Sequence, residues 1–283
     1  MSNEMKGYRV ILQVESTSEF VEYTGKITKT LVFALNPDLQ LIRGIKGVLS
    51  PLHISPLFKP SGDYELGEPS YPFVLKRRKG YQNDIKPIRI QGEYVFHIGG
   101  EEKLIDHVIT SLSKLSSPLI IKIGDALVSY RVEKIIDVTN IVRDKVESLD
   151  KRVRVYLKAP AQIFNVFVPT KLPKFTPSAL ELLLTPYALI SRAHTITDQL
   201  IFSATKLLGN LVETWYSLKT LWPIEVYFDN KKQTLLGGYV TYILEPRTTN
   251  VKEELKEVLA TAELAGIGRS RMNGFGTTVV LCD

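Results

Sequence analysis

Cysteine is almost absent from this chain: among 283 residues, Cys282 is the single cysteine. One cysteine excludes both a disulfide within the chain and a metal site built from several thiolates. Long apolar runs are also missing, since the uninterrupted ones, such as residues 119–121 and 182–184, are far shorter than the ~20 residues of a membrane helix. Residues 1–8 contain no apolar core, so we expect no signal peptide. We therefore predict a cytoplasmic protein without a membrane anchor.

A strong charge of one sign is missing too, but a moderate positive excess is present. The chain has 36 lysines and arginines against 30 acidic residues, which gives a formal net charge of +6. Such an excess favours an acidic partner, most commonly nucleic acid, although it equally fits a basic protein without one. The length suits two domains of ~100–150 residues each.

The apolar periodicity of the first half predicts the order strand, helix, strand, strand, helix, strand. This order is the split βαβ pattern of the ferredoxin-like fold. Between the second and third strands, the basic segment 73–86 is expected to form a loop or hairpin. The predicted elements are a strand at 8–14, a helix at 26–35, an irregular or edge strand at 48–58, a strand at 92–98, a helix at 101–115, and strands at 119–123 and 128–138.

The second half repeats this pattern without detectable sequence identity to the first. Its predicted elements are a strand at 153–157, helices at 177–184 and 197–218, hairpin strands at 224–228 and 235–244, a helix at 252–264, and a strand at 277–281. Pro186 is expected to end the first of these helices. The polar segment 139–151 is the best boundary, although it could be one helix of a single larger fold. We predict an α+β protein of two tandem ferredoxin-like (RRM-like) domains, residues 1–145 and 146–283.

The most informative segment is the glycine-rich loop, residues 266–276, between the last helix and the last strand. It holds four glycines and two arginines in eleven residues. Glycine lets another backbone approach closely, free N–H groups can surround an anion, and arginine suits phosphate. We therefore predict a phosphate cradle; its residues are Gly266, Gly268, Arg269, Ser270, Arg271, Gly274 and Gly276. A simple tight turn is the alternative.

Two better-known glycine motifs do not fit this segment. A dinucleotide-binding fingerprint lies between a strand and a following helix, whereas this loop follows a helix. A P-loop requires Gly-Lys-Ser or Gly-Lys-Thr, which is absent from the segment.

A helix that leads into Gly-Ile-Gly-Arg-Ser-Arg and a terminal strand resembles the C-terminal signature of the CRISPR-associated repeat-RNA-processing endoribonucleases. These enzymes belong to the RAMP superfamily, and the resemblance is strongest to crenarchaeal members. Segments 50–58, 92–99 and 233–244 resemble other strands of that family. The resemblance implies two tandem ferredoxin-like domains and one cut per CRISPR repeat in precursor RNA, without a metal or other cofactor. It is also compatible with a homodimer and with assembly among CRISPR effector subunits.

In that family the ribose 2′-hydroxyl attacks the adjacent phosphate, a reaction that requires proton transfer and positive charge near the phosphate. Many members place a histidine in or after the first helix, and the first helix of this chain has none. The resemblance instead points to Lys26 and Lys29 on the first helix, and to Lys46 before the second strand. Lys26 and Lys29 share a helix face, which could also be an ordinary solvated one. His53 is the remaining catalytic candidate, or a half-buried strand histidine.

Further cations could follow an RNA backbone. Lys76, Arg77 and Arg78 form a basic run near Tyr81, which fits phosphate contact and stacking or else a solvated loop. Lys231 and Lys232 lie in the C-terminal hairpin, where related enzymes can carry an arginine at the position of Thr234. Tyr156 and Lys158 are weaker candidates for base stacking and phosphate contact.

Three functions remain open at this point. The first is an endoribonuclease that produces CRISPR guide RNA. The second is a non-catalytic RNA-binding subunit of a CRISPR effector complex with the same fold and loop. The third is a protein that binds a nucleotide or phosphometabolite through the loop.

Overall fold

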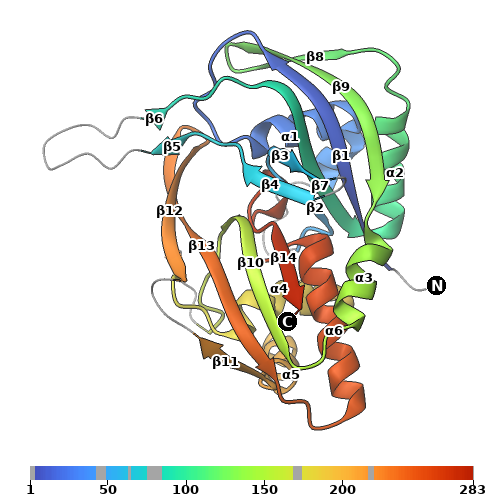
Figure 1. Ribbon diagram of the computed structural model, residues 1–283, viewed down its shortest axis with the longest axis vertical. Coiled ribbons are helices and arrows are strands. Elements are labelled where there is room, and N and C mark those ends of the chain that lie inside the picture. Colours follow the sequence, from blue (N-terminus) through green and yellow to red (C-terminus); the bar gives the residue numbers. More distant parts are fainter. Residues whose placement is uncertain are drawn as a thin grey trace, which may run out of the picture.

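The computed structural model describes residues 4–42, 49–62, 65–74, 85–167, 174–215 and 220–282. In this part of the chain, two antiparallel sheets form, each with helices against one of its faces (Figure 1). The first sheet lies above the second in this view, and both have the strand order of a ferredoxin-like unit. The predicted α+β class with two such units is therefore confirmed.

The first sheet is built around β1 (Met5–Ser16), which pairs with β7 on one side and with β9 on the other. Its strand order is β4-β3-β7-β1-β9-β8, and β2 also pairs with β7. The bounds of these strands are Leu52–Ile54 for β2, Phe58–Ser61 for β3, Glu65–Pro69 for β4, Gln91–Glu101 for β7, Leu119–Ile123 for β8 and Ala126–Asp137 for β9. Short strands β5 (Phe73–Val74) and β6 (Ile85–Lys86) pair with each other.

The side chains of β1 alternate between the two faces of the first sheet, and most of the apolar ones lie on the face that the helices cover. Val10, Leu12 and Val14 point to one face, where they pack with Ile27 and Leu31 in a buried core. The helices of this half are α1 (Gly25–Leu35), the 3₁₀ segment η1 (Pro37–Ile42) and α2 (Glu102–Ser113). The other face of the sheet is turned toward the second half of the chain.

The second sheet has the order β11-β13-β10-β14, with β12 paired to β13. Its strands are β10 (Arg152–Ala161), β11 (Leu211–Trp215), β12 (Leu221–Phe228), β13 (Lys231–Leu244) and β14 (Thr278–Cys282). The helices of this half are α4 (Ala179–Ile190), α5 (Asp198–Leu208) and α6 (Thr249–Ala265). No helix in the described part of the chain is long and apolar enough to cross a membrane.

Two predictions in the second half are wrong. Pro186 lies inside α4 instead of ending it, because the helix is buried on almost all sides and its packing outweighs one lost backbone hydrogen bond. The helix predicted over 197–218 ends at Leu208, followed by Gly209 as its C-cap. Residues 211–215 form the edge strand β11 instead, and 216–218 lie outside the described residues.

The polar segment between the halves forms helix α3 (Thr139–Glu147). Val142 and Val146 are buried in the core of the second half, while the hydroxyl of Thr139 accepts a hydrogen bond from the Gly7 amide at 3.1 Å. This helix thus contacts both halves. A boundary at residue 145 falls inside it, and the division into 1–145 and 146–283 stays a prediction.

Candidate functional site

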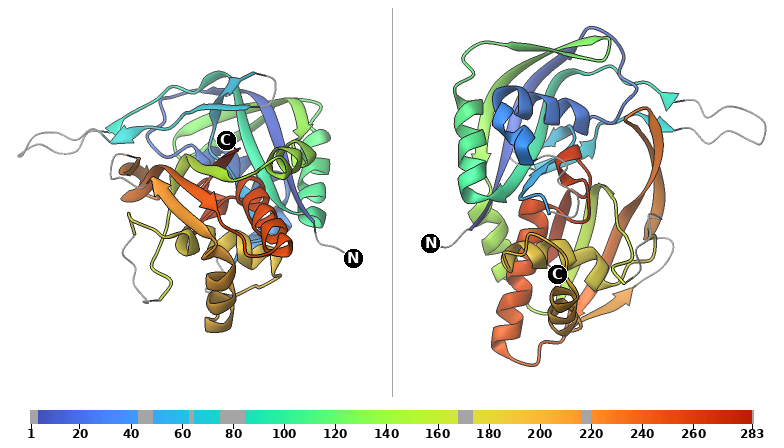
Figure 2. Two further views of the ribbon diagram at one scale, coloured as in Figure 1. Left: turned by 60° about the horizontal axis from the view of Figure 1, so that its bottom comes forward. Right: turned by 180° about the vertical axis from the view of Figure 1, so that it is seen from behind.

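The glycine-rich loop lies directly against the start of α1. A Cβ on Gly25 would be 2.1 Å from the carbonyl oxygen of Asn273, so only glycine fits this approach. Gly274 has a φ of 91°, and its Cβ would be 2.9 Å from the Cα of Gly25. Seen from behind, the loop lies beside α1 (Figure 2). Two segments far apart in the sequence therefore touch through their backbones.

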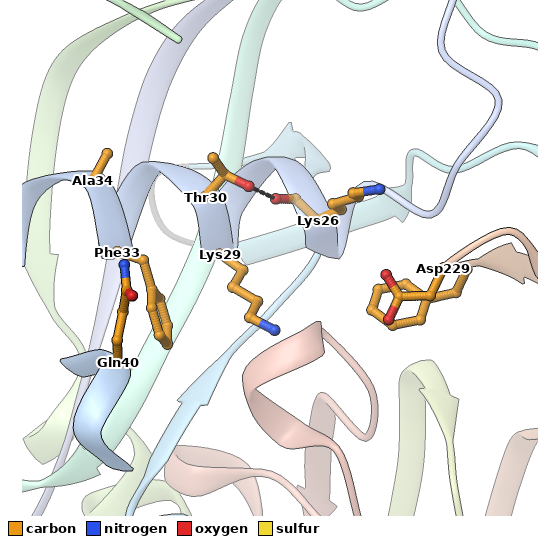
Figure 3. A pocket seen from close by; sticks show the side chains of 8 residues that line it. Lys26, Lys29, Thr30, Phe33, Ala34, Gln40 and Asp229 are labelled. Atoms are coloured by element: carbon orange, nitrogen blue, oxygen red, sulfur yellow. Dashed lines mark hydrogen bonds between the residues drawn. The ribbon is translucent and has the colours of Figure 1, made fainter. Parts of the chain in front are cut away.

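Lys29 joins the two segments by a side-chain contact. Its Nζ donates to Oδ1 of Asn273, a residue of the short helix η2 (Arg271–Asn273), at 2.5 Å. Lys26 lies one turn earlier, where its Nζ pairs with Glu22 at 2.6 Å. The two ammonium groups therefore point in different directions, and Lys29 is the one directed at the loop (Figure 3).

A hollow of about 350 Å³ opens beside these lysines, between α1 and the turn that joins β12 to β13. We call it the α1 hollow; it is lined by Lys26, Lys29, Thr30, Phe33, Ala34, Gln40, Phe228 and Asp229. The turn is held near α1 because the amide of Tyr23 donates to the carbonyl of Tyr227 at 2.9 Å. Lys231 and Lys232 directly follow the turn and are exposed, with Lys232 paired to Glu225 at 2.8 Å.

Arg271 is buried, with only 3% of its surface exposed. Its guanidinium donates to the carbonyl of Ala265 at 2.5 Å and also to the carbonyl of Ser50 in the first half. Burial lowers the pKa of Arg271 to about 10. The prediction that Arg271 contacts RNA therefore needs correction. Its guanidinium points inward and hydrogen-bonds the loop to the first half of the chain.

His53 is fully buried behind the loop. Its Nδ1 lies 3.2 Å from the carbonyl oxygen of Arg271, and its Nε2 lies 3.1 Å from Oγ1 of Thr277. Because a carbonyl only accepts, Nδ1 carries the proton and Nε2 accepts from the threonine hydroxyl. Burial, with the nearby charge of Arg271, lowers the pKa of His53 to about 3. His53 is thus a neutral support of the loop and not a member of the α1 hollow.

This environment predicts a loss of stability in mild acid. The unfolded chain binds a proton at His53 near pH 6.5, whereas the folded chain binds it only near pH 3. The free energy of unfolding should therefore be unaffected by this group above pH 6.5 and fall as the pH decreases toward 3. Burial also lowers the pKa of His97, which acts in the same direction. Urea unfolding between pH 4 and 8 would measure the slope of the free energy of unfolding against pH.

The variant His53→Gln can replace part of the hydrogen bonding but does not titrate, so its slope should be shallower than that of the wild type. His107→Gln is the matched control, since His107 lies on α2 with about half of its side chain exposed. Equal slopes in His53→Gln and the wild type would refute the assignment.

Unlike Arg271, the loop residues Arg269 and Ser270 are exposed to solvent. The guanidinium of Arg269 lies 4.5 Å from the ring centroid of Phe164. The amide of Arg269 and the hydroxyl of Ser270 both bind Gln162, at 3.0 Å each. Of the two arginines of the loop, Arg269 is the one that a ligand can reach.

The remaining predicted residues fall in two groups. Lys46, Lys76, Arg77 and Arg78 lie outside the described residues. Tyr156 and Lys158 are half-buried on the face of the second sheet that is turned toward the first sheet, where the ring of Tyr156 stacks on that of Tyr239 at 6.3 Å between centroids. Together with Arg154 and Arg9, they line a cavity of about 430 Å³ between the two sheets.

Arg154 in the cavity between the sheets was not predicted from the sequence, nor were Gln40 and Asp229 in the α1 hollow. The alternation of Arg154, Tyr156 and Lys158 along one strand was a usable signal, because residues two apart share a face of the sheet. No such signal existed for Asp229, which meets α1 only through the tertiary fold, whereas Gln40 lies in η1, directly after α1 in the chain.

The amino-acid sequence matches no protein-family model and no curated protein sequence. The fold, however, matches solved structures over almost the whole chain. It is similar to a Cas6 product complex, with a TM-score of 0.63, 15% identity, and coverage of 98% of this chain and 100% of that one. A RAMP protein binding different RNA substrates gives a TM-score of 0.56 at 14% identity, with coverage of 98% and 99%. A Cas6-related protein from Pyrococcus furiosus gives 0.56 at 12% identity, with coverage of 97% and 98%. The predicted resemblance is therefore confirmed at the level of the fold.

Proposed function

We propose that this protein is an endoribonuclease that binds CRISPR repeat RNA in precursor transcripts and cuts it without a metal ion. The observation that carries the proposal is the contact between Lys29 and Asn273, which brings a lysine of α1 to the glycine-rich loop. Several backbone amides of this loop donate within the protein, so its positive charge comes from side chains and not from a cradle of free N–H groups. The shared fold with a Cas6 product complex and with an RNA-binding RAMP protein supports RNA as the ligand.

The proposed reaction is a transesterification. The 2′-oxygen of one ribose forms a bond to the adjacent phosphorus, and the bond from this phosphorus to the 5′-oxygen of the next nucleotide breaks. A proton leaves the 2′-hydroxyl and another reaches the 5′-oxygen, so the products are a 2′,3′-cyclic phosphate and a 5′-hydroxyl. Negative charge grows on the phosphate oxygens in the transition state, and a fixed ammonium group stabilises it.

We assign this stabilising role to Lys29, because its ammonium is held at the loop by Asn273. Lys26 lies at the same hollow and adds positive charge for a neighbouring phosphate. In this proposal, Arg271 and His53 act as positioning residues: they hold the shape of the loop and do not touch RNA.

Further residues outside the α1 hollow would also bind RNA. Arg269, accessible beside Phe164, is suited to a backbone phosphate, and Lys231 is exposed next to the α1 hollow. In the cavity between the two sheets, the half-buried rings of Tyr156 and Tyr239 would stack on a base, as in RRM domains, with the ammonium of Lys158 5.5 Å from the centroid of Tyr156.

The test is incubation of the protein with a labelled repeat RNA in EDTA. A parallel RNA carries a 2′-deoxy substitution at the cut. We expect one cut, with a cyclic phosphate end, that disappears with the 2′-deoxy RNA. Tight, salt-sensitive binding without a cut would instead identify the non-catalytic RNA-binding subunit. Failure to bind RNA would refute both of these functions and leave a nucleotide or phosphometabolite as ligand.

A further inference from the structure

The α1 hollow contains more than the two lysines. Phe33 and Phe228 supply apolar side chains to its wall, and Gln40 and Asp229 supply an amide and a carboxylate. Figure 3 shows Gln40 and Phe33 on one side and Asp229 on the other, with the ammonium of Lys29 between them. A volume of about 350 Å³ is at the small end of the range for ligand pockets, which suits one nucleotide and not a helix.

Asp229 stands out as the acidic residue that lines the hollow. It is exposed, and no hydrogen bond or ion pair of its carboxylate is found within the described part of the chain. The lysines of the hollow are engaged elsewhere, Lys26 with Glu22 and Lys29 with Asn273. A carboxylate beside a phosphate site opposes RNA binding unless the RNA itself supplies hydrogen-bond donors to it.

The backbone conformation at position 229 explains why a small polar residue stands there, but it does not require a charged one. Asp229 and Asn230 form a two-residue turn with φ values of 51° and 58°. Asparagine, aspartate and glycine all tolerate such a conformation, and asparagine would do so without a charge.

We propose that the α1 hollow takes one guanine base from a nucleotide next to the scissile phosphate, and that Asp229 recognises its Watson–Crick edge. A carboxylate only accepts hydrogen bonds, and it has two oxygens side by side. Guanine alone presents two neighbouring donors on that edge, the ring N1–H and the 2-amino group. Adenine and cytosine each present one amino donor next to an acceptor, which would face the carboxylate without a proton.

The rest of the hollow fits the same base. The amide of Gln40 can donate to N7 or O6, the acceptors that guanine carries away from its 2-amino group. Proteins read unpaired RNA bases in part by bonds to their edges. Phe33 and Phe228 are buried, with 7% and 5% of their surface exposed, so they contribute apolar wall to the hollow and not a free ring face. This inference rests on the proposed function and adds the specificity of the same site.

The experiment compares RNAs that carry guanine, adenine, cytosine or uracil at each nucleotide beside the cut. Cleavage rates under single-turnover conditions and Kd values with uncleavable 2′-deoxy RNAs are measured for each. The wild type should prefer guanine at one position by about 5- to 100-fold, the range of one two-bond base contact. Inosine, which lacks the 2-amino group, should lie between guanine and adenine.

The variant Asp229→Asn keeps the turn but replaces one acceptor by a donor, so it should lose the preference for guanine and favour adenine or cytosine. Asp125→Asn is the matched control, because Asp125 lies in the β8–β9 turn, outside the hollow, and should leave the preference unchanged. Equal use of all four bases by the wild type, or the same base ranking in Asp229→Asn, would overturn the inference.

The two measurements keep this result separate from the proposed function. If the wild type binds RNA but cuts none, the nuclease proposal fails, and the base preference is still decided by the Kd values. If it binds no RNA at all, both fail together.

Discussion

Replacing Lys29 with alanine is expected to slow cleavage of repeat RNA by about 10²–10³-fold, the usual effect of removing one fixed donor at a developing negative charge. RNA affinity should change far less, because Lys29 would be one of several cations that bind the backbone. The ammonium is held 2.5 Å from Asn273 in the loop, so alanine removes the positive charge that contacts the loop from α1. Single-turnover rates, with binding measured separately on a 2′-deoxy RNA, test both statements.

Lys103→Ala is the matched control for this variant. Lys103 is an exposed lysine on α2 that does not line the α1 hollow, so its loss should leave the rate within about two-fold of the wild type. Thermal unfolding of Lys29→Ala should show that the fold is intact. A Lys29→Ala protein that is folded and cuts as fast as the wild type would remove Lys29 from the reaction.

Adding one methyl group at Gly25 is expected to damage both stability and cleavage. The Cβ of Gly25→Ala would lie 2.1 Å from the carbonyl oxygen of Asn273 and 3.0 Å from the Cα of Gly274, so α1 and the loop must separate. We expect about 1–3 kcal/mol less stability, as for other overpacked contacts. Cleavage should fall by about 10²-fold, because a shift of ~1 Å in the position of a reacting group has an effect of this size.

Gly209→Ala provides the comparison, because Gly209 caps α5 with a φ of −65°, and its Cβ would lie 2.8 Å from the carbonyl oxygen of Thr205 and not against the loop. It should lose some stability in urea unfolding but cleave RNA like the wild type. If Gly25→Ala were as stable and as active as Gly209→Ala, the close backbone contact would not matter for the reaction.

The fold was predictable from the sequence where local patterns were strong. Alternating Val10, Leu12 and Val14 specified a strand with one covered face, and the glycine-rich loop specified a tight connection between a helix and the last strand. Predictions failed where tertiary packing outweighed a local signal: Pro186 sits inside a buried helix, and residues 211–215 extend a sheet edge instead of a helix.

The site was predictable only in part, because burial cannot be read from residue type. Lys29 and Arg269 lie where a ligand can meet them, whereas Arg271 and His53 turn inward to hydrogen-bond partners in the other half of the chain. The spacing of Lys26 and Lys29 showed a shared helix face but not their separate partners. Asp229 gave no signal, because its position beside α1 depends on the hairpin that carries it.

The contact between Lys29 and Asn273 joins residues 244 positions apart, and this separation has a consequence for synthesis on the ribosome. A nascent chain can complete α1 and the whole first sheet while the loop has not yet been translated. Such a chain carries the lysines but lacks the glycine-rich loop, and the carbonyl of Ser50 still lacks the guanidinium of Arg271. In the proposed function, a growing polypeptide therefore cannot cut RNA, including its own messenger, until translation has passed residue 276 and the loop has docked.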